Sequence, residues 1–315
     1  MSDTGKWTAE DLPDLSGRTM IVTGGNSGLG LETVRALAGK EAHVVLACRD
    51  AARAAGAVDE VRRSHPDASL EAMTLDLASL ASVRDFAKAF LDRHERLDVL
   101  CNNAGVMALP ARKTADGFEM QLGTNHLGHF ALTGLLLERL LAMPSARIVT
   151  VSSTMHKIGK IHFDDLQWER SYRKWPAYGQ SKLANLLFTY ELQRRLEARS
   201  QNAIAAASHP GYAATNLQAT GPRMAGSSFM ERATGWANGV FAQSAAMGAL
   251  PSIYAAAGPD VKGGDYFGPD GFMENAGHPT RVKSNARSHD REVAARLWEI
   301  SESLTGVRYD ALASE

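Results

Sequence analysis

Short apolar runs typical of buried strands alternate with longer, helix-like segments between residues 19 and 211. In chain order, the apolar runs read TMIVTGG, AHVVLACR, SLEAMTLDL, LDVLCNNAG, ARIVTVSS and NAIAAASHPG. Continuous apolar strands that are separated by helices predict a parallel sheet with both of its faces covered. The connections between such strands should be right-handed crossovers. The alternation therefore predicts an α/β fold built on a doubly wound parallel sheet.

The remaining segments divide the chain further. Helices are expected at residues 29–40, 50–64, 80–95 and 118–142, and around the sequence YGQSK at 178–182. No linker or second core interrupts the pattern, so we predict a single Rossmann-type domain over residues 18–315, preceded by a leader over residues 1–17. A lengthened connection at 154–177 and a glycine- and methionine-bearing segment at 216–241 depart from the alternation.

The segment at 216–241 is the expected place of a substrate lid. Its large apolar side chains are Met224, Phe229, Met230, Trp236 and Phe241. They could line an apolar pocket for a small carbonyl or alcohol. They could equally pack against the sheet or against a neighbouring subunit, and the sequence does not separate these interpretations.

Charge, polarity and cysteine content exclude some partners and compartments. A net charge of −1 argues against a nucleic-acid partner. The first 17 residues are polar and no apolar run reaches the roughly 18 residues of a membrane span, so we expect neither a signal peptide nor an integral membrane anchor. The only two cysteines, Cys48 and Cys101, lie in apolar runs, which favours reduced thiols in a cytoplasmic protein.

The first apolar run leads directly into TGGNSGLG, Thr23 to Gly30. Glycines at positions 24, 28 and 30 would allow a tight turn and a close approach of the backbone to a pyrophosphate. The helix that follows would direct its free N–H groups and its positive dipole end at those phosphates. The spacing is neither GxGxxG nor that of a P-loop, but its place after the first strand predicts a dinucleotide-binding turn.

The end of the second apolar run, ACRD, predicts which dinucleotide binds. An NAD site usually has an acid there that holds the ribose 2′-hydroxyl. Here Cys48 and Arg49 take that place, and a guanidinium can pair with a 2′-phosphate. Asp50 follows, but we expect it to cap the next helix. We therefore favour NADP(H) over NAD(H), although Arg49 could also be an ordinary solvated residue.

YGQSK places Tyr178 and Lys182 four residues apart on a helix, where they would be neighbours. A nearby cation favours the ionised form of an acid, so we expect the pKa of Tyr178 to lie below its usual value of about 10. Such a phenol could act as a general acid or base.

His126 and His129 lack a third ligand at metal-site spacing and are expected to pack in the helix and cleft. His209 reads as a strand-end residue or a cleft residue.

Together these motifs resemble those of the short-chain dehydrogenase/reductase superfamily, in the family's order along residues 20–216. The family's motifs have counterparts here: TGxxxGxG, an acid after the third strand, NNAG, a helix asparagine, a serine, YxxxK and PG. The resemblance implies coenzyme contacts from Gly24, Asn26, Ser27, Gly28, Leu29, Gly30, Arg49, Asp76, Leu77, Asn102, Asn103, Ala104, Gly105, Tyr178, Lys182, Pro210, Gly211 and Thr215. It implies a catalytic set of Asn125, Ser153, Tyr178 and Lys182.

The roles of these residues also follow from the resemblance. Tyr178 would exchange the proton, and Lys182 would hold the nicotinamide ribose. Ser153 would hydrogen-bond the reacting oxygen. Asn125 would hold a water that links Lys182 to solvent, and Thr215 would fix the carboxamide.

Within the superfamily, the chain resembles the retinol dehydrogenase-like branch, which includes protochlorophyllide reductase-like proteins and WW-domain oxidoreductases. The segments that carry this likeness are LACRD, NNAGVM, TNHLGHF, SKLANLLFTYEL and GGDYFGPDG. Its members generally interconvert alcohols with aldehydes or ketones, usually with NADP(H). Because we expect no membrane anchor, the resemblance gives less support to a membrane-borne retinoid as the substrate. The assembly could be a homodimer or a homotetramer. A non-catalytic NADP(H) sensor is the alternative, but sensors of this type typically lose the tyrosine or lysine. A sugar-nucleotide epimerase would normally carry TGxxGxxG.

Overall fold

The computed structural model describes residues 5–212 and 243–313. Their centre is an eight-stranded sheet in the order β3-β2-β1-β4-β5-β6-β7-β8. The strands are β1 Thr19–Thr23, β2 His43–Cys48, β3 Leu70–Thr74, β4 Val99–Asn102, β5 Arg147–Val151, β6 Ile204–Ser208, β7 Tyr266–Pro269 and β8 Pro279–Arg281. β1 to β7 are mutually parallel, so the predicted doubly wound α/β sheet is confirmed.

The last two strands were not foreseen in the sequence. β8 pairs antiparallel with β7, so the sheet is mostly parallel and has one antiparallel edge strand that was not predicted. β7 has four residues and β8 three, and each contains a proline. Glycine and proline interrupt the apolar run of β7, and β8 has no large apolar residue, so neither strand stands out as an apolar run. The antiparallel edge strand is a common addition to a parallel sheet.

The main helices are α1 Gly28–Ala38, α2 Ala51–Ser64, α3 Leu80–Arg93, α6 Lys174–Ala198, α9 Ala245–Ala257 and α10 Arg291–Thr305. The single helix expected at 118–142 is divided in three: α4 Met120–Leu122, the π-type turn η2 Gly123–Leu127, and α5 Gly128–Leu141. Gly128 meets another chain segment at this division. A Cβ atom there would lie 2.5 Å from the Leu77 carbonyl oxygen. The wide turn therefore sits where the helix crosses the segment after β3.

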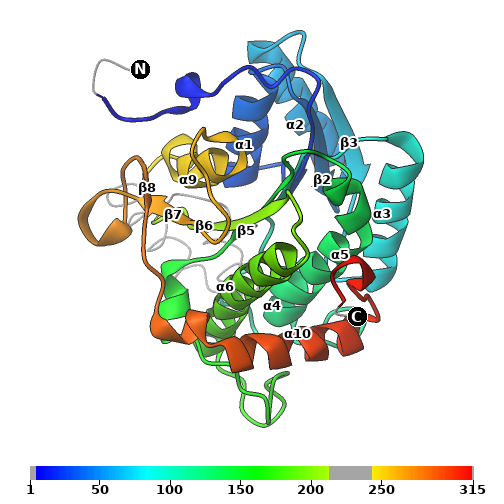
Figure 1. Cartoon of the computed structure of the whole chain (residues 1–315), viewed down its shortest axis with the longest axis vertical. Coiled ribbons are helices and arrows are strands. Elements are labelled where there is room, and N and C mark those ends of the chain that lie inside the picture. The colour runs from blue at the N-terminus through cyan, green and yellow to red at the C-terminus, as the bar shows by residue number, and fades with distance from the viewer. Residues whose placement is uncertain (1–4, 213–242, 314–315) are drawn as a thin grey trace.

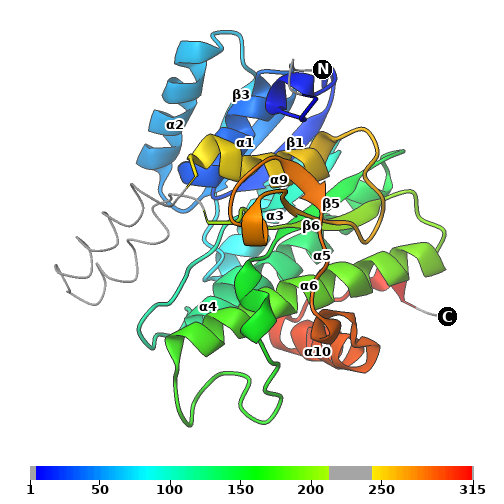
Figure 2. The same cartoon turned by 90° about the vertical axis from the view of Figure 1, so that its left-hand side faces the viewer.

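Alternate residues of each strand face different helices, as the two-residue period of a strand requires. Ile21 faces the core formed with α3, α5 and α6, whereas Met20 and Val22 face the core formed with α1, α2 and α9. Figures 1 and 2 show these helices covering the sheet, with α10 outside α6. Because the strands are parallel, the carboxyl ends of β1, β4, β5 and β6 meet at one edge.

The described part of the leader packs onto this domain. Leu12 and Leu15 are buried in the core beside α1 and α9. The ring of Trp7 meets that of Tyr254 on α9 edge-on, with centroids 4.8 Å apart. Among the helices described, none combines the length and the apolar character that crossing a bilayer would take.

Candidate active site

The glycine-rich turn after β1 has the conformation that its glycines permit. Gly24 and Gly28 have φ values of 66° and 53°, which favour glycine. A Cβ atom on Gly30 would lie 2.2 Å from the Gly24 carbonyl oxygen, so only glycine fits there. Ser27 is the N-cap of α1; Asn26 precedes it and Leu29 lies in the first turn of the helix. The turn therefore presents a helix N-terminus suited to an anion such as a pyrophosphate.

The end of β2 has the arrangement expected for Asp50. The Asp50 side chain accepts a hydrogen bond from the Arg53 N–H at 3.0 Å and so caps α2. Arg49 is exposed, and its guanidinium has no hydrogen bond or ion pair with another residue of the described ranges. Cys48 is buried and its thiol donates to the Asp50 carbonyl at 3.3 Å. The arginine is thus the side chain at this strand end that is available to a ligand.

The predicted coenzyme residues after β3 and β4 have defined contacts, and those of Asn103 are with the glycine turn. The Asp76 carboxylate accepts from the Ala78 N–H at 3.0 Å, and Leu77 between them is buried. The Asn102 side-chain amide donates to the Thr133 hydroxyl on α5 at 3.0 Å. Asn103 donates through its side chain to the Thr23 carbonyl at 2.7 Å.

Gly105 connects this region with the proposed catalytic residues. A Cβ atom on Gly105 would lie 3.2 Å from Asn125 Oδ1 and 3.5 Å from Lys182 Nζ. Tyr178 and Lys182 are buried on α6, with 4% and 3% of their surfaces exposed. Ser153, which follows β5, is close enough to Tyr178 to lower the pKa of its hydroxyl. The structure therefore brings Asn125, Ser153, Tyr178 and Lys182 together beside NNAG.

The charges of this group differ from the expectation. Burial raises the pKa of Tyr178 to about 12, and the nearby Ser153 only partly opposes this. Burial lowers the pKa of Lys182 to about 8. The predicted lowering of the Tyr178 pKa by Lys182 is therefore wrong for the polypeptide itself. Loss of hydration penalises both the Tyr178 phenolate and the Lys182 ammonium. The ammonium donates a hydrogen bond to the Val151 carbonyl at 3.0 Å.

Asn125 is fully buried, and both polar atoms of its side chain are hydrogen-bonded. Its Oδ1 accepts from the Val106 N–H at 2.8 Å. Its Nδ2 donates to the Val106 carbonyl and to the Ser181 hydroxyl, both at 2.9 Å. Ser181 in turn donates to the Tyr178 carbonyl at 2.8 Å. The asparagine side chain thus supports the backbone around Tyr178, and its own carbonyl oxygen faces His129.

The comparisons with known proteins agree with this arrangement. Residues 18–225 match the family model described as short chain dehydrogenase. The chain belongs to the short-chain dehydrogenase family. Human retinol dehydrogenase 13 is 43% identical to this short-chain dehydrogenase, over 93% of this chain and 86% of the relative. Mouse retinol dehydrogenase 14 is 44% identical, over 93% of this chain and 87% of the relative.

Solved structures similar to this short-chain dehydrogenase include an uncharacterized protein from Mycobacterium paratuberculosis. It is 43% identical, with a TM-score of 0.79 over 96% of this chain and 99% of that chain. A protein from Beutenbergia cavernae, solved with bound NADP at low occupancy, is 26% identical, with a TM-score of 0.59 over 78% of this chain and 91% of that chain. The predicted family is thereby confirmed.

Three buried histidines around the site have defined partners. His126 lies 2.9 Å from the Ser301 hydroxyl, whereas His129 lies 2.9 Å from the Thr23 hydroxyl, so the two do not converge on one point. Burial lowers their pKa values to about 3 and about 4. His156, which the sequence analysis overlooked, donates from Nδ1 to the Ser153 carbonyl at 2.6 Å. Its place three residues after Ser153 was the available signal.

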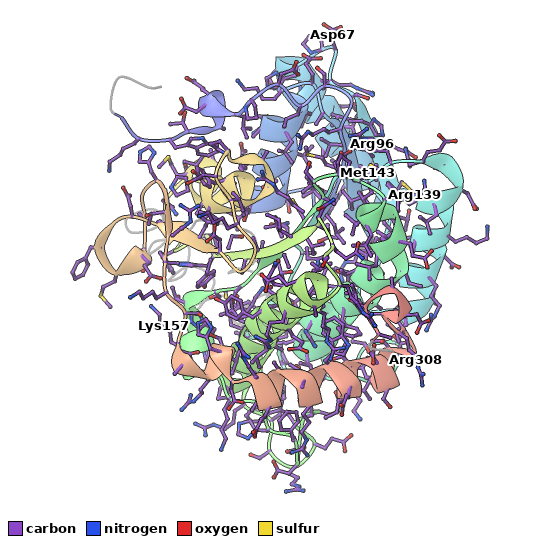
Figure 3. All side chains as sticks on the ribbon, viewed as in Figure 1. Asp67, Arg96, Arg139, Met143, Lys157 and Arg308 are labelled. Atoms are coloured by element: carbon purple, nitrogen blue, oxygen red, sulfur yellow. The ribbon has the colours of Figure 1, made fainter. Side chains whose placement is uncertain are left out.

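The segment after β6 brings Pro210 and Gly211 against the loop between β7 and β8. Gly211 has a φ of 63°, and a Cβ atom there would lie 2.4 Å from the Asn275 carbonyl oxygen. His209 Nε2 lies 3.0 Å from Glu274, which also lies 3.7 Å from Lys157, labelled in Figure 3. His209 therefore occupies a contact between two loops. Thr215 and the expected lid, with Met224, Phe229, Met230, Trp236 and Phe241, lie outside the described residues.

Within the two described ranges, one group of three residues has the composition of a metal site. It consists of His43 and Glu71, at the amino ends of β2 and β3, and His94, which directly follows α3. Glu71 already pairs with Arg93 at 2.8 Å and with His94 at 2.9 Å. The His94 carbonyl accepts from Arg139, labelled in Figure 3. Ion pairing accounts for this grouping.

Proposed function

We propose that this short-chain dehydrogenase transfers hydride between NADP(H) and an apolar aldehyde, ketone or alcohol, with Tyr178 as the general acid and base. The observation that carries the proposal is the meeting of Ser153, Tyr178 and Lys182 beside Gly105, next to the glycine turn. The bound nicotinamide would supply or accept the hydride. The glycine turn, Arg49 and NNAG would hold the coenzyme.

In the reducing direction, Tyr178 would give its proton to the substrate oxygen. A phenol whose pKa is about 12 is protonated at neutral pH and can therefore donate. The Ser153 hydroxyl would hydrogen-bond the same oxygen as negative charge develops there. Lys182, with a pKa of about 8, is mostly cationic at pH 7 and would stabilise that charge. In the oxidising direction, Tyr178 would have to lose its proton first, so alkaline conditions should favour alcohol oxidation.

The coenzyme preference is inferred from Arg49. An exposed guanidinium with no protein partner in the described ranges can form charge-assisted hydrogen bonds with a 2′-phosphate. The Asp50 carboxylate next to Arg49 is engaged in capping α2, so it is not the acid that would hold a ribose hydroxyl. The Beutenbergia protein with bound NADP is consistent with this assignment.

The apolar character of the substrate is inferred from exposed apolar side chains, two of which lie beside Tyr178 or its neighbour Gly179. The exposed large hydrophobic residues of the described ranges are Ile158, Trp175, Tyr212, Phe272 and Met273. The ring of Trp175 lies edge-on to that of Tyr178, with centroids 6.5 Å apart. Ile158 faces Gly179, and Tyr212 donates its N–H to Asn275 beside the loop that carries Phe272. The relatives named retinol dehydrogenases support an apolar alcohol or its carbonyl.

A panel of carbonyls and alcohols, followed by NADPH absorbance with NADH alongside, tests this proposal. The panel should range from a very small aldehyde to extended apolar aldehydes and ketones. We expect turnover with NADPH to rise with the apolar size of the carbonyl and to be weaker with NADH. Tight NADPH binding without turnover on any member would favour the non-catalytic sensor instead.

A further inference from the structure

His129 joins the two halves of the site through buried hydrogen bonds. It lies in the first turn of α5, and 1% of its surface is exposed. Its Nε2 is 2.9 Å from the Thr23 hydroxyl, immediately before the glycine turn. Its Nδ1 is 3.0 Å from the carbonyl oxygen of Asn125, four residues earlier. Both ring nitrogens are therefore engaged, one on each side of the site.

These contacts determine which nitrogen carries the proton. The Asn125 carbonyl can only accept, so Nδ1 must donate, and in a neutral imidazole Nε2 must then accept. The Thr23 hydroxyl can donate to Nε2 while it accepts from the backbone N–H groups of Asn103 and Ala104, both at 2.9 Å. A second acceptor for that proton, the Cys101 carbonyl, is farther away at 3.3 Å. A directed chain thus runs from NNAG through Thr23 and His129 to Asn125.

The fold explains why a side chain can hold this carbonyl. Asn125 lies within η2, whose wider turn interrupts the regular α-helical ladder. Side chains on a helix tilt toward its N-terminus, so an imidazole at position 129 reaches back over Asn125. Asn125 supports Ser181, and Ser181 supports the Tyr178 backbone. Displacement of Asn125 would therefore reach Tyr178 and Lys182.

We propose that His129 is a positioning residue, which holds the Asn125 backbone and couples it to the coenzyme-binding turn for the reaction proposed above. It does not touch the reacting atoms, since Thr23 and Asn125 stand on either side of it. The inference rests on the proposed function. His126 provides a matched control, because it is buried near His129 and makes one side-chain hydrogen bond, to Ser301.

The test compares His129→Phe and His129→Asn with His126→Phe. His129→Phe removes both bonds, and we expect kcat to fall by about 10- to 100-fold, as for other small displacements of reacting groups. His129→Asn keeps a donor near the Nδ1 position and should recover part of that loss. His126→Phe should lose comparable thermal stability but keep kcat within about twofold. Equal losses of kcat in His126→Phe and His129→Phe, or normal kcat in His129→Phe, would overturn the proposal.

A second measurement does not depend on turnover. The Kd for NADPH is measured between pH 6.5 and 9.5 in the same proteins, and Lys182→Met identifies the inflection that belongs to Lys182. His129→Phe should shift this inflection, because displacement of Asn125 would reach Lys182. His126→Phe should leave the inflection in place. An unshifted inflection in His129→Phe overturns the inference even if no substrate is found. A shifted inflection with no turnover on any carbonyl would support His129 and reject the proposed reaction. A wild type that does not bind NADPH would overturn both.

Discussion

The Lys182 ammonium lies 5.8 Å from the centre of the Tyr178 ring, and both side chains are buried on one turn of α6. The lysine is held by the carbonyl of Val151 at the end of β5, at 3.0 Å. No carboxylate of the described ranges pairs with it. Its charge is therefore desolvated without an ionic partner, which is costly for folding. The arrangement makes sense if the charge is needed for chemistry.

Lys182→Met should abolish turnover and at the same time stabilise the protein. Relief of a buried charge whose pKa falls from 10.5 to about 8 is worth roughly 1–3 kcal/mol of unfolding free energy at pH 7. The Val151 carbonyl keeps a donor, because Asn185 Nδ2 also bonds it at 3.0 Å. Urea unfolding with no coenzyme added measures the difference.

The gain should depend on pH in a defined direction. The folded-state pKa of Lys182 is below its unfolded value, so between pH 8 and 10.5 the unfolded chain binds more protons. Wild-type stability should therefore recover with rising pH. The advantage of Lys182→Met should be full below pH 8 and should shrink toward pH 10.5. A variant that is less stable at pH 7 would show that the lysine is structural.

Arg49→Ala should change coenzyme preference. Charge-assisted hydrogen bonds to a phosphate are worth about 1.5–3 kcal/mol, so NADPH affinity should fall on the order of 10- to 100-fold while NADH affinity barely changes. Isothermal titration with both coenzymes measures this. Arg63→Ala, an exposed arginine near the other end of α2, controls for net charge and should leave both affinities unchanged. Equal losses with both coenzymes would assign Arg49 a structural role.

Gly30→Ala should damage the glycine turn. The new methyl group would lie 2.2 Å from the Gly24 carbonyl oxygen, and overpacking of this kind costs typically 1–3 kcal/mol. NADPH binding should be lost with it. Gly56→Ala on α2 is the matched control, since nothing lies within 4 Å of its Cβ position. It should stabilise the protein by roughly 0.5–1 kcal/mol. A Gly30→Ala variant with normal stability and normal NADPH affinity would contradict this account of the turn.

Local patterns in the sequence predicted much of the fold and the residue set at the site. The six buried strands before residue 211 were visible as apolar runs, and YGQSK as a helical pair. β7 and β8 were not, because β7 contains a glycine and a proline and β8 has no large apolar residue. The protonation of Tyr178 also escaped prediction, since burial depends on which segments surround the side chain. His129 meets Thr23 across 106 positions of sequence, a contact that only the folded sheet creates.

Tyr178→Phe tests the central proposal most directly. The substitution removes the hydroxyl beside Ser153 and leaves the ring beside Trp175 and Lys182. NADPH affinity and the oxidation of NADPH by the best carbonyl of the panel should be measured on the same sample. We expect turnover to fall by at least about 10²-fold, the lower range for loss of a general acid, with the Kd for NADPH nearly unchanged. Normal turnover in Tyr178→Phe, or a loss explained by failure to bind NADPH, would contradict the account.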